Sequence, residues 1–257
     1  MLRRAKDLTG LKLGAQDGEI GKVKDFYFDD QTWTIRYLVA DTGNWLTGRL
    51  VLISPFAVKG IDRDAGHIDV NLTKARIEHS PSIDVAKPVS RQFETDYARY
   101  YGWPMYWYGP ALWGPTPYPL YEPSAHIPVA DPMLTREKGD PHLRSASEVK
   151  GYPIHARDGD LGHVEDFIVA EDDWAIRYFV VDTRNWWPGK KVLIGTQWIR
   201  EVSWDKSRVT VDLSQEQIKS APEYDHGVEL SREFEKRLHE HYEREPYWTA
   251  AHHEHAA

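Results

Sequence analysis

Histidine is the residue type of this chain that is best suited to ligate a metal ion, and it gathers near the C-terminus. His239 and His241 lie in a segment with helical spacing, and three more histidines follow (His252, His253 and His255). Residues i and i+2 of a helix point to different faces, so the first pair is poorly placed to share an ion. Residues 249–257 are expected to form a disordered tail. We therefore predict no physiological metal site.

Adjacent carboxylates occur twice, as Asp29-Asp30 and as Glu171-Asp172-Asp173. Carboxylate oxygens are the ligands that Ca²⁺ and Mg²⁺ prefer in proteins. Neither run has the alternating Asp-x-Asp-x-Asp-Gly spacing of a calcium-binding loop, however. We interpret both runs as solvated turns.

An acid stands beside a hydroxyl in Asp41-Thr42 and again in Asp182-Thr183. A nucleophile needs an activating base within hydrogen-bond reach, and no His or Lys recurs beside both pairs. Asp41 and Asp182 are therefore expected to shape loops by accepting hydrogen bonds from their own backbone.

Composition argues against several classes of function. Cysteine is absent, which excludes disulfides and thiolate chemistry and fits a cytoplasmic location. A net charge of −8 opposes nucleic-acid binding through a broad basic surface. No apolar stretch approaches the roughly 18 residues that a membrane span requires. Because no motif for catalysis, a cofactor or a metal is present, we predict that the chain is not an enzyme.

The chain contains one sequence twice, with an offset of 141 residues that places Gly10 on Gly151. From residue 8 to residue 107, about a third of the positions are identical in the second copy, without a gap. The identical pairs include Asp25 and Asp166, Trp33 and Trp174, Arg36 and Arg177, Tyr37 and Tyr178, and Asp41 and Asp182. So long an offset indicates duplication of a whole domain, since solenoid repeats span about 20–50 residues.

Alternating hydrophobicity and turn residues predict about six short strands in each copy. In the first copy we expect them at residues 12–15, 21–28, 33–40, 50–53, 56–61 and 67–72. Strands this short and regular favour a small barrel or rolled sheet over a fold of alternating strands and helices. Arg36 and Arg177 fall on the strand face opposite Trp33 and Tyr37. For both arginines we expect an ion pair at the barrel surface or at an interface rather than an anion site.

Helical segments follow the strands of each copy. Ser214 and Gln217 have the spacing of a capping box at the start of one helix. Residues 90–101 place an aromatic stripe on one helical face, and the second copy repeats part of it (Phe93, Tyr97, Tyr100 and Tyr101; Phe234, Leu238 and Tyr242). These helices are expected to pack that stripe against a barrel.

The sequences GEIGKVKDF at residues 18–26 and WTIRYLV at residues 33–39, followed by Asp41-Thr42, resemble the PRC-barrel domain family. Residues 159–182 resemble it as strongly. The family is named after the cytoplasmic domain of the photosynthetic reaction-centre H subunit and includes the C-terminal domain of a ribosome maturation factor. The resemblance implies a compact six-strand β-barrel that binds other macromolecules, and it implies no catalytic residues. The membrane helix of the reaction-centre subunit has no counterpart here.

The fold class that follows is mainly β with flanking helices, in two tandem small PRC-like β-barrels. We place the first barrel and its helix at 1–108, a linker at 109–145, the second barrel and its helix at 146–248, and the tail at 249–257.

The linker carries eight prolines interleaved with aromatic residues. One interpretation is an extended, polyproline-like strap whose rings cover the barrel surface. The other is an exposed surface that recognises a protein, because Trp and Tyr are favoured where partners bind. The candidate interaction surface comprises Trp103, Tyr106, Trp107, Tyr108, Trp113, Tyr118 and Tyr121.

From these observations we expect a non-enzymatic interaction or scaffold protein of the bacterial cytoplasm, with a protein partner and a possible homodimer. The alternative is a small-molecule-binding protein or enzyme with a pocket between the two barrels. Association with ribosomes or RNA is a weaker option, because the acidic charge balance opposes it.

Overall fold

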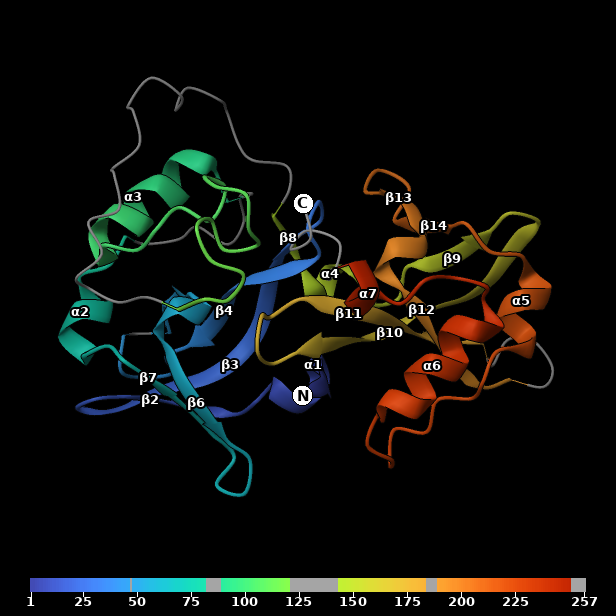
Figure 1. Cartoon of the computed structure of the whole chain (residues 1–257). Coiled ribbons are helices and arrows are strands. Elements are labelled where there is room, and N and C mark those ends of the chain that lie inside the picture. Colours follow the sequence, from blue (N-terminus) through green and yellow to red (C-terminus); the bar gives the residue numbers. More distant parts are fainter. Residues whose placement is uncertain (47, 82–88, 121–142, 184–188, 251–257) are drawn as a thin grey trace. The chain divides into compact units, whose positions relative to one another are not determined.

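The computed structural model describes residues 1–46, 48–81, 89–120, 143–183 and 189–250, and the chain divides into two compact units (Figure 1). The first unit comprises Met1 with residues 5–148 and 170–176, and the second comprises residues 2–4, 149–169 and 177–257. Each copy of the repeat therefore supplies most of one unit and a short segment of the other.

Six strands of the first unit follow the order β5-β4-β3-β2-β7-β6 across a curled sheet. They are β2 (Lys12–Ala15), β3 (Gly18–Asp29), β4 (Thr34–Asp41), β5 (Leu50–Ile53), β6 (Val58–Asp62) and β7 (His67–Val70). A 3₁₀ turn, η1 (Pro55–Ala57), joins β5 to β6. All pairings in this order are antiparallel except that of β2 with β7. The six strands predicted from the sequence are confirmed, with β3 longer than expected.

The second unit repeats this arrangement in the order β12-β11-β10-β9-β14-β13. Its strands are β9 (Pro153–Ala156), β10 (Gly159–Ala170), β11 (Ile176–Asp182), β12 (Lys191–Gly195), β13 (Ile199–Ser203) and β14 (Arg208–Val211). A 3₁₀ turn, η3 (Thr196–Trp198), takes the place of η1. In both units a glycine lies where the long strand passes the main chain of its neighbour. A side chain on Gly21 would collide with the carbonyl of Asp41, and one on Gly162 with that of Asp182.

A seventh strand joins each sheet, and it comes from the other copy of the repeat. Strand β1 (Leu2–Arg4) pairs with β10 in the second unit, and β8 (Leu143–Ser145) pairs with β3 in the first. In the β3–β8 pair, Tyr27 lies opposite Ser145 and Asp29 opposite Leu143. The expectation of six strands therefore needs correction to seven. Three-residue strands have too little alternation to show in a sequence.

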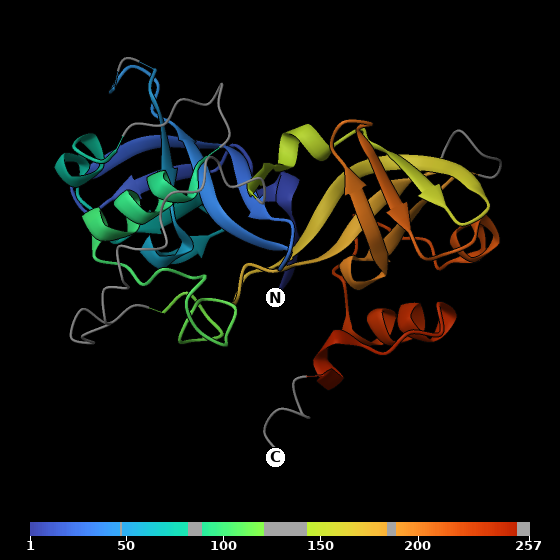
Figure 2. The same cartoon turned by 90° about the horizontal axis from the view of Figure 1, so that it is seen from above.

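The helices are short, and α3 and α6 lie outside the curled sheets of their units (Figure 2). They are α1 (Ala5–Leu8), α2 (Lys74–Glu78), α3 (Arg91–Tyr101), α4 (Ala146–Val149), α5 (Gln215–Ser220), α6 (Arg232–His241) and α7 (Tyr247–Ala250). Ser90 and Ser231 cap the starts of α3 and α6, and the predicted capping box of Ser214 and Gln217 is present.

Helix α7 includes the first two residues of the predicted tail, and residues 251–257 lie outside the described residues. No helix among the described residues is long and apolar enough to cross a membrane.

Strand β4 forms the centre of the first unit and is buried from Thr34 to Ala40. This corrects the expectation that Arg36 faces a barrel surface, since Arg36 is only 2% exposed. The side chain of Tyr97 in α3 covers the sheet and donates a hydrogen bond to the carbonyl of Leu52. The loop after α3 covers Arg36 itself, where its main chain and rings contact the guanidinium.

Candidate functional site

A fully buried carboxylate holds the helix and the following loop against the sheet of the first unit. Glu94 lies in the first turn of α3 and is 0% exposed. Its Oε1 accepts hydrogen bonds from the hydroxyls of Tyr37, at 3.0 Å, and Tyr106, at 2.7 Å. Its Oε2 lies 3.2 Å from Nη1 of Arg91, one helical turn earlier. A strand, a helix and a loop thus meet on one side chain.

The second unit contains the same cluster at positions 141 residues farther on. Glu235 in α6 accepts hydrogen bonds at Oε1 from Tyr178, at 2.9 Å, and from Tyr247, at 3.0 Å. Its Oε2 lies 3.0 Å from Nη1 of Arg232. All four positions carry the same residue type in both copies, so the duplication has preserved the cluster as a unit.

Electrostatics keep the phenols of these clusters protonated. Burial, followed by the charge of Glu94, raises the pKa of Tyr37 and Tyr106 well above the usual value. Burial also raises the pKa of Tyr247 to about 12 and raises the pKa of the Glu235 carboxyl. A phenol with a raised pKa is a poor base at neutral pH, and a carboxylate held by hydroxyl and guanidinium donors is a poor nucleophile. The arrangement is suited to fixing structure.

The first unit closes its cluster with residues of its own linker. The guanidinium of Arg36 lies between the rings of Tyr106 and Trp113, at 3.8 and 4.8 Å from their centroids. Its Nη1 donates a hydrogen bond to the carbonyl of Leu112 at 2.7 Å, and its Nη2 forms an ion pair with Asp29 at 3.5 Å. Trp113 is 0% exposed. The ion pair expected for Arg36 is therefore present, in the interior.

The corresponding place in the second unit is a crevice. The guanidinium of Arg177 lies 4.3 Å from the ring centroid of Tyr247, as Arg36 lies on Tyr106. Position 254, which corresponds to Trp113, lies outside the described residues. A small crevice with room for about one water molecule is lined by Arg177, Tyr178, Gly195, Thr196, Gln197, Trp198, His239 and Tyr247.

His239 adds a titratable group to the second cluster, where the first copy has Ala98. Its Nε2 lies 3.0 Å from the hydroxyl of Tyr178, and its ring packs on Trp198 and Trp248. The ring is 3% exposed, and no described residue gives Nδ1 a partner with hydrogen-bond geometry. Burial lowers the pKa of His239, and the nearby main chain of Arg244 and Glu245 opposes part of this effect.

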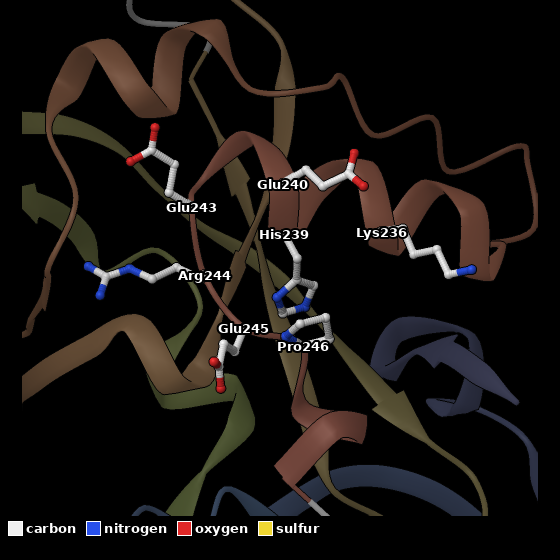
Figure 3. A pocket seen from close by; sticks show the side chains of 7 residues that line it. All are labelled: Lys236, His239, Glu240, Glu243, Arg244, Glu245 and Pro246. Atoms are coloured by element: carbon white, nitrogen blue, oxygen red, sulfur yellow. The ribbon is translucent and has the colours of Figure 1, made fainter.

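A second hollow, broadly open to solvent, adjoins His239 at the end of α6. Figure 3 shows the imidazole between α6 and the segment from Arg244 to Pro246, with charged side chains around it. His241 instead contacts the carbonyl of Gln217 at 2.8 Å. The two histidines therefore diverge, as their spacing predicted. Among the described residues, no three His, Cys, Asp or Glu side chains are grouped to hold a metal ion. His252, His253 and His255 lie outside the described residues.

Three of the paired acids lie in ion pairs, which corrects their interpretation as solvated, whereas Asp172 is exposed as expected. Asp29 is 5% exposed and pairs with Arg36, while Asp30 lies 3.1 Å from Nε of Arg144. Glu171 lies 2.8 Å from Nη2 of Arg63. Asp41 shapes its loop as predicted, by accepting a hydrogen bond from the backbone N–H of Gly43 at 3.0 Å.

The residues predicted as an interaction surface separate into a buried and an exposed group. Tyr106 and Trp113 are buried in the cluster, and Trp103 stacks on Tyr101 at 4.3 Å. Half-buried Trp107 stacks on Arg91 at 4.2 Å. Tyr118 is 43% exposed, Tyr108 is half-buried, and Tyr121 lies outside the described residues. The described part of the linker also turns, with Ala111 bridged to Gly114, and is not extended.

The residues that sequence reasoning missed are Glu94, Glu235 and their partners. A signal was available, since Arg91 and Glu94 recur as Arg232 and Glu235 at the repeat offset. Their helical spacing gave the appearance of an ordinary solvent-exposed pair. Only the fold shows that the two tyrosines reach the carboxylate from a strand and a loop.

Two duplicated seven-stranded β units, each with a carboxylate cluster beneath its helix, define a tandem β-barrel protein. A model of the PRC-barrel domain family matches residues 2–77 and 141–218, which is more than half of the chain. The chain therefore belongs to the PRC-barrel domain family and carries the domain twice. A comparison with curated proteins found no match.

Proposed function

We propose that this protein is a non-enzymatic interaction protein that binds another macromolecule through barrel and linker surfaces. The polar groups that the two clusters share support this function because they are engaged with one another. Glu94 and Glu235 each receive two phenol hydrogen bonds and an arginine. A catalytic base or nucleophile must instead be directed at a substrate.

The observation that carries the proposal is an exposed apolar patch on the linker of the first unit. Tyr118 is 43% exposed and Leu120 is 69% exposed, and both belong to the few large apolar side chains in the described residues that face solvent. We call Tyr118, Pro119 and Leu120 the linker patch. Pro119 and Leu120 border an open hollow whose other walls include Val58, Ile61 and Trp174. Contiguous apolar surface beside a hollow is characteristic of a protein-binding site.

The test is crosslinked affinity capture from a native lysate with three forms of the protein. The double variant Tyr118→Ser/Leu120→Ser removes the apolar patch without touching a buried side chain. Val228→Ser is the matched control, because Val228 is 64% exposed and lies in the second unit. We expect a partner that the wild type and the control capture and the double variant does not. Equal capture by all three forms, or no partner above background, would contradict the proposal.

A cytoplasmic location and a homodimeric state belong to the same proposal. The absence of cysteine supports the first. The small-molecule or enzyme alternative stays a prediction from the sequence.

A further inference from the structure

Strand β6 is an edge of the sheet in the first unit. In the order β5-β4-β3-β2-β7-β6 it stands last, and among the described strands only β7 pairs with it. An edge strand presents a row of backbone N–H and C=O groups that can pair with an added strand. The edge of β6 is therefore a place where another chain can join the sheet by main-chain hydrogen bonds.

The hollow beside the linker patch runs along this edge. Four successive residues of β6, from Val58 to Ile61, line it together with Leu120 of the linker patch. Four residues correspond to about 13 Å of extended chain. The hollow has a volume of about 250 Å³, which holds on the order of 15 water molecules, so it has room for side chains of an added segment.

Gly60 leaves the hollow open at the middle of β6. A Cβ atom at this position would meet no atom within 4 Å. The repeat offset relates Gly60 to Glu201 of β13, the corresponding edge strand of the second unit. The position therefore accepts a side chain, and glycine leaves space there that a side chain occupies in the second copy.

The corresponding edge of the second unit carries charges of the kind that protect an edge strand from pairing. Arg200, whose Nη2 lies 3.2 Å from the carboxylate of Asp212, is followed directly by exposed Glu201. Both edge strands have the same register irregularity, within residues 58–60 and 199–201. The difference between the two edges thus lies in their side chains, and β6 is the less protected edge.

We propose that the hollow binds an extended segment of another protein, which joins β6 as an added strand. The main chain of the segment pairs with β6, and its apolar side chains on one face pack against Ile61 and Leu120. This inference rests on the interaction function proposed above and names the partner of the linker patch. That partner is a strand with alternating apolar residues that are flanked by basic ones.

The charges of the hollow favour basic flanking residues. Glu171 and Asp172 line the hollow together with Lys59, so carboxylates outnumber ammonium groups. Glu171 lies 2.8 Å from Nη2 of Arg63, whereas exposed Asp172 has no hydrogen bond or ion pair with a described residue. A lysine or arginine of the partner supplies the counter-charge for Asp172.

The probe is the capped, fluorescein-labelled peptide KTVTLTK, titrated into the full chain and followed by anisotropy. Its apolar residues and its lysines share one face of an extended chain, because alternate side chains point the same way. We expect saturable binding with a dissociation constant below about 1 mM. At about ten times that concentration, the peptide should slow hydrogen exchange within residues 58–62 about tenfold. Residues 199–203 of β13 are the internal control and should exchange at an unchanged rate.

The variant Gly60→Phe places a ring in the space that the segment needs and should weaken binding at least about tenfold. Its matched control is Glu201→Phe, which adds the same side chain at the corresponding exposed position of β13 and should leave the affinity unchanged. Asp172→Lys should weaken binding of KTVTLTK about two- to fivefold and strengthen binding of ETVTLTE by a similar factor, since exposed charge pairs contribute modestly. Circular dichroism shows whether each variant is folded.

No binding of KTVTLTK, or binding that leaves hydrogen exchange within residues 58–62 unchanged, would overturn strand addition. Equal affinities of Gly60→Phe and Glu201→Phe would also overturn it. Self-association of the chain that the peptide competes away would overturn it in favour of a second copy. The proposed function fails by a different result, equal capture of lysate proteins with and without the linker patch, and the peptide titration uses no lysate.

Discussion

Gly102 and Glu243 occupy the same position in the two copies, and both have left-handed backbone, with φ of 74° and 54°. Each follows the last turn of its helix. The backbone N–H of the next residue, Trp103 or Arg244, returns to a carbonyl inside the helix, that of Ala98 or His239. Glycine adopts this conformation without steric cost, whereas a residue with a side chain does not. The second copy therefore holds a strained residue beside the hollow at His239.

Relief of this strain should stabilise the protein. We expect Glu243→Gly to raise the free energy of unfolding by about 1 kcal/mol and the converse change, Gly102→Glu, to lower it by about 1–2 kcal/mol. Urea denaturation followed by circular dichroism measures both. Equal effects of the same sign would show that the left-handed conformation is not the cause.

The buried carboxylates should be necessary for stability in both units. Glu94→Ala leaves the hydroxyls of Tyr37 and Tyr106 without their acceptor and should cost about 3–5 kcal/mol. Glu235→Ala should cost less, because Tyr247 is half-exposed and water can replace the acceptor. Chemical denaturation of the two variants provides the comparison. A neutral effect of Glu94→Ala would refute the structural function of the cluster.

His239 should make stability depend on pH on the acid side. Because burial lowers the pKa of His239 below its usual value of about 6.5, the folded state favours the neutral ring. This contribution is complete above about pH 6.5 and is lost as the pH falls through the lower folded-state pKa. We expect the melting temperature of the wild type to fall more steeply than that of His239→Gln from pH 7 to pH 5. Parallel curves would exclude His239 as the source. The comparison must be made at one ionic strength because the positive charge of Arg232 also faces this ring.

Asp25 should hold the exchanged segment at β8 and α4 in the first unit. Its carboxylate accepts hydrogen bonds from the backbone N–H of Ser147 at 3.0 Å and from the hydroxyls of Ser145 and Ser147. We expect Asp25→Ala to increase hydrogen exchange across residues 143–148 at least about tenfold, since these bonds contribute about 1–3 kcal/mol. Exposed Asp64 supplies the control. An unchanged exchange rate in Asp25→Ala would show that strand pairing alone retains the segment.

Much of the fold followed from local pattern. Tyr37 and Asp41 stand in predicted elements because alternation and turn chemistry act over a few residues. The exchanged strand β8 could not be predicted from local pattern, because it depends on the pairing of Tyr27 with Ser145, 118 positions farther along the chain. Arg36 was given a surface position because a charged side chain is seldom buried unless its partners surround it. Those partners, Asp29, Tyr106 and Leu112, come together only in the folded unit.

The candidate site, like the fold, could be predicted from the sequence only in part. The aromatic residues of the linker were recognised from composition, yet nothing local distinguishes buried Trp113 from exposed Tyr118. The crevice at Gln197 was invisible because it is defined by a difference between copies, in which Phe56 is replaced by a polar residue.

The central claim is that the linker patch, where Tyr118 and Leu120 face solvent, binds another macromolecule. The most direct measurement is the amount of crosslinked partner that is captured by the wild type, by Tyr118→Ser/Leu120→Ser and by the exposed control Val228→Ser, with folding of each protein checked by circular dichroism. We expect a partner on the wild type and on the control, and loss of that partner from the double variant. Equal capture by all three proteins, or no partner above background, would contradict the claim.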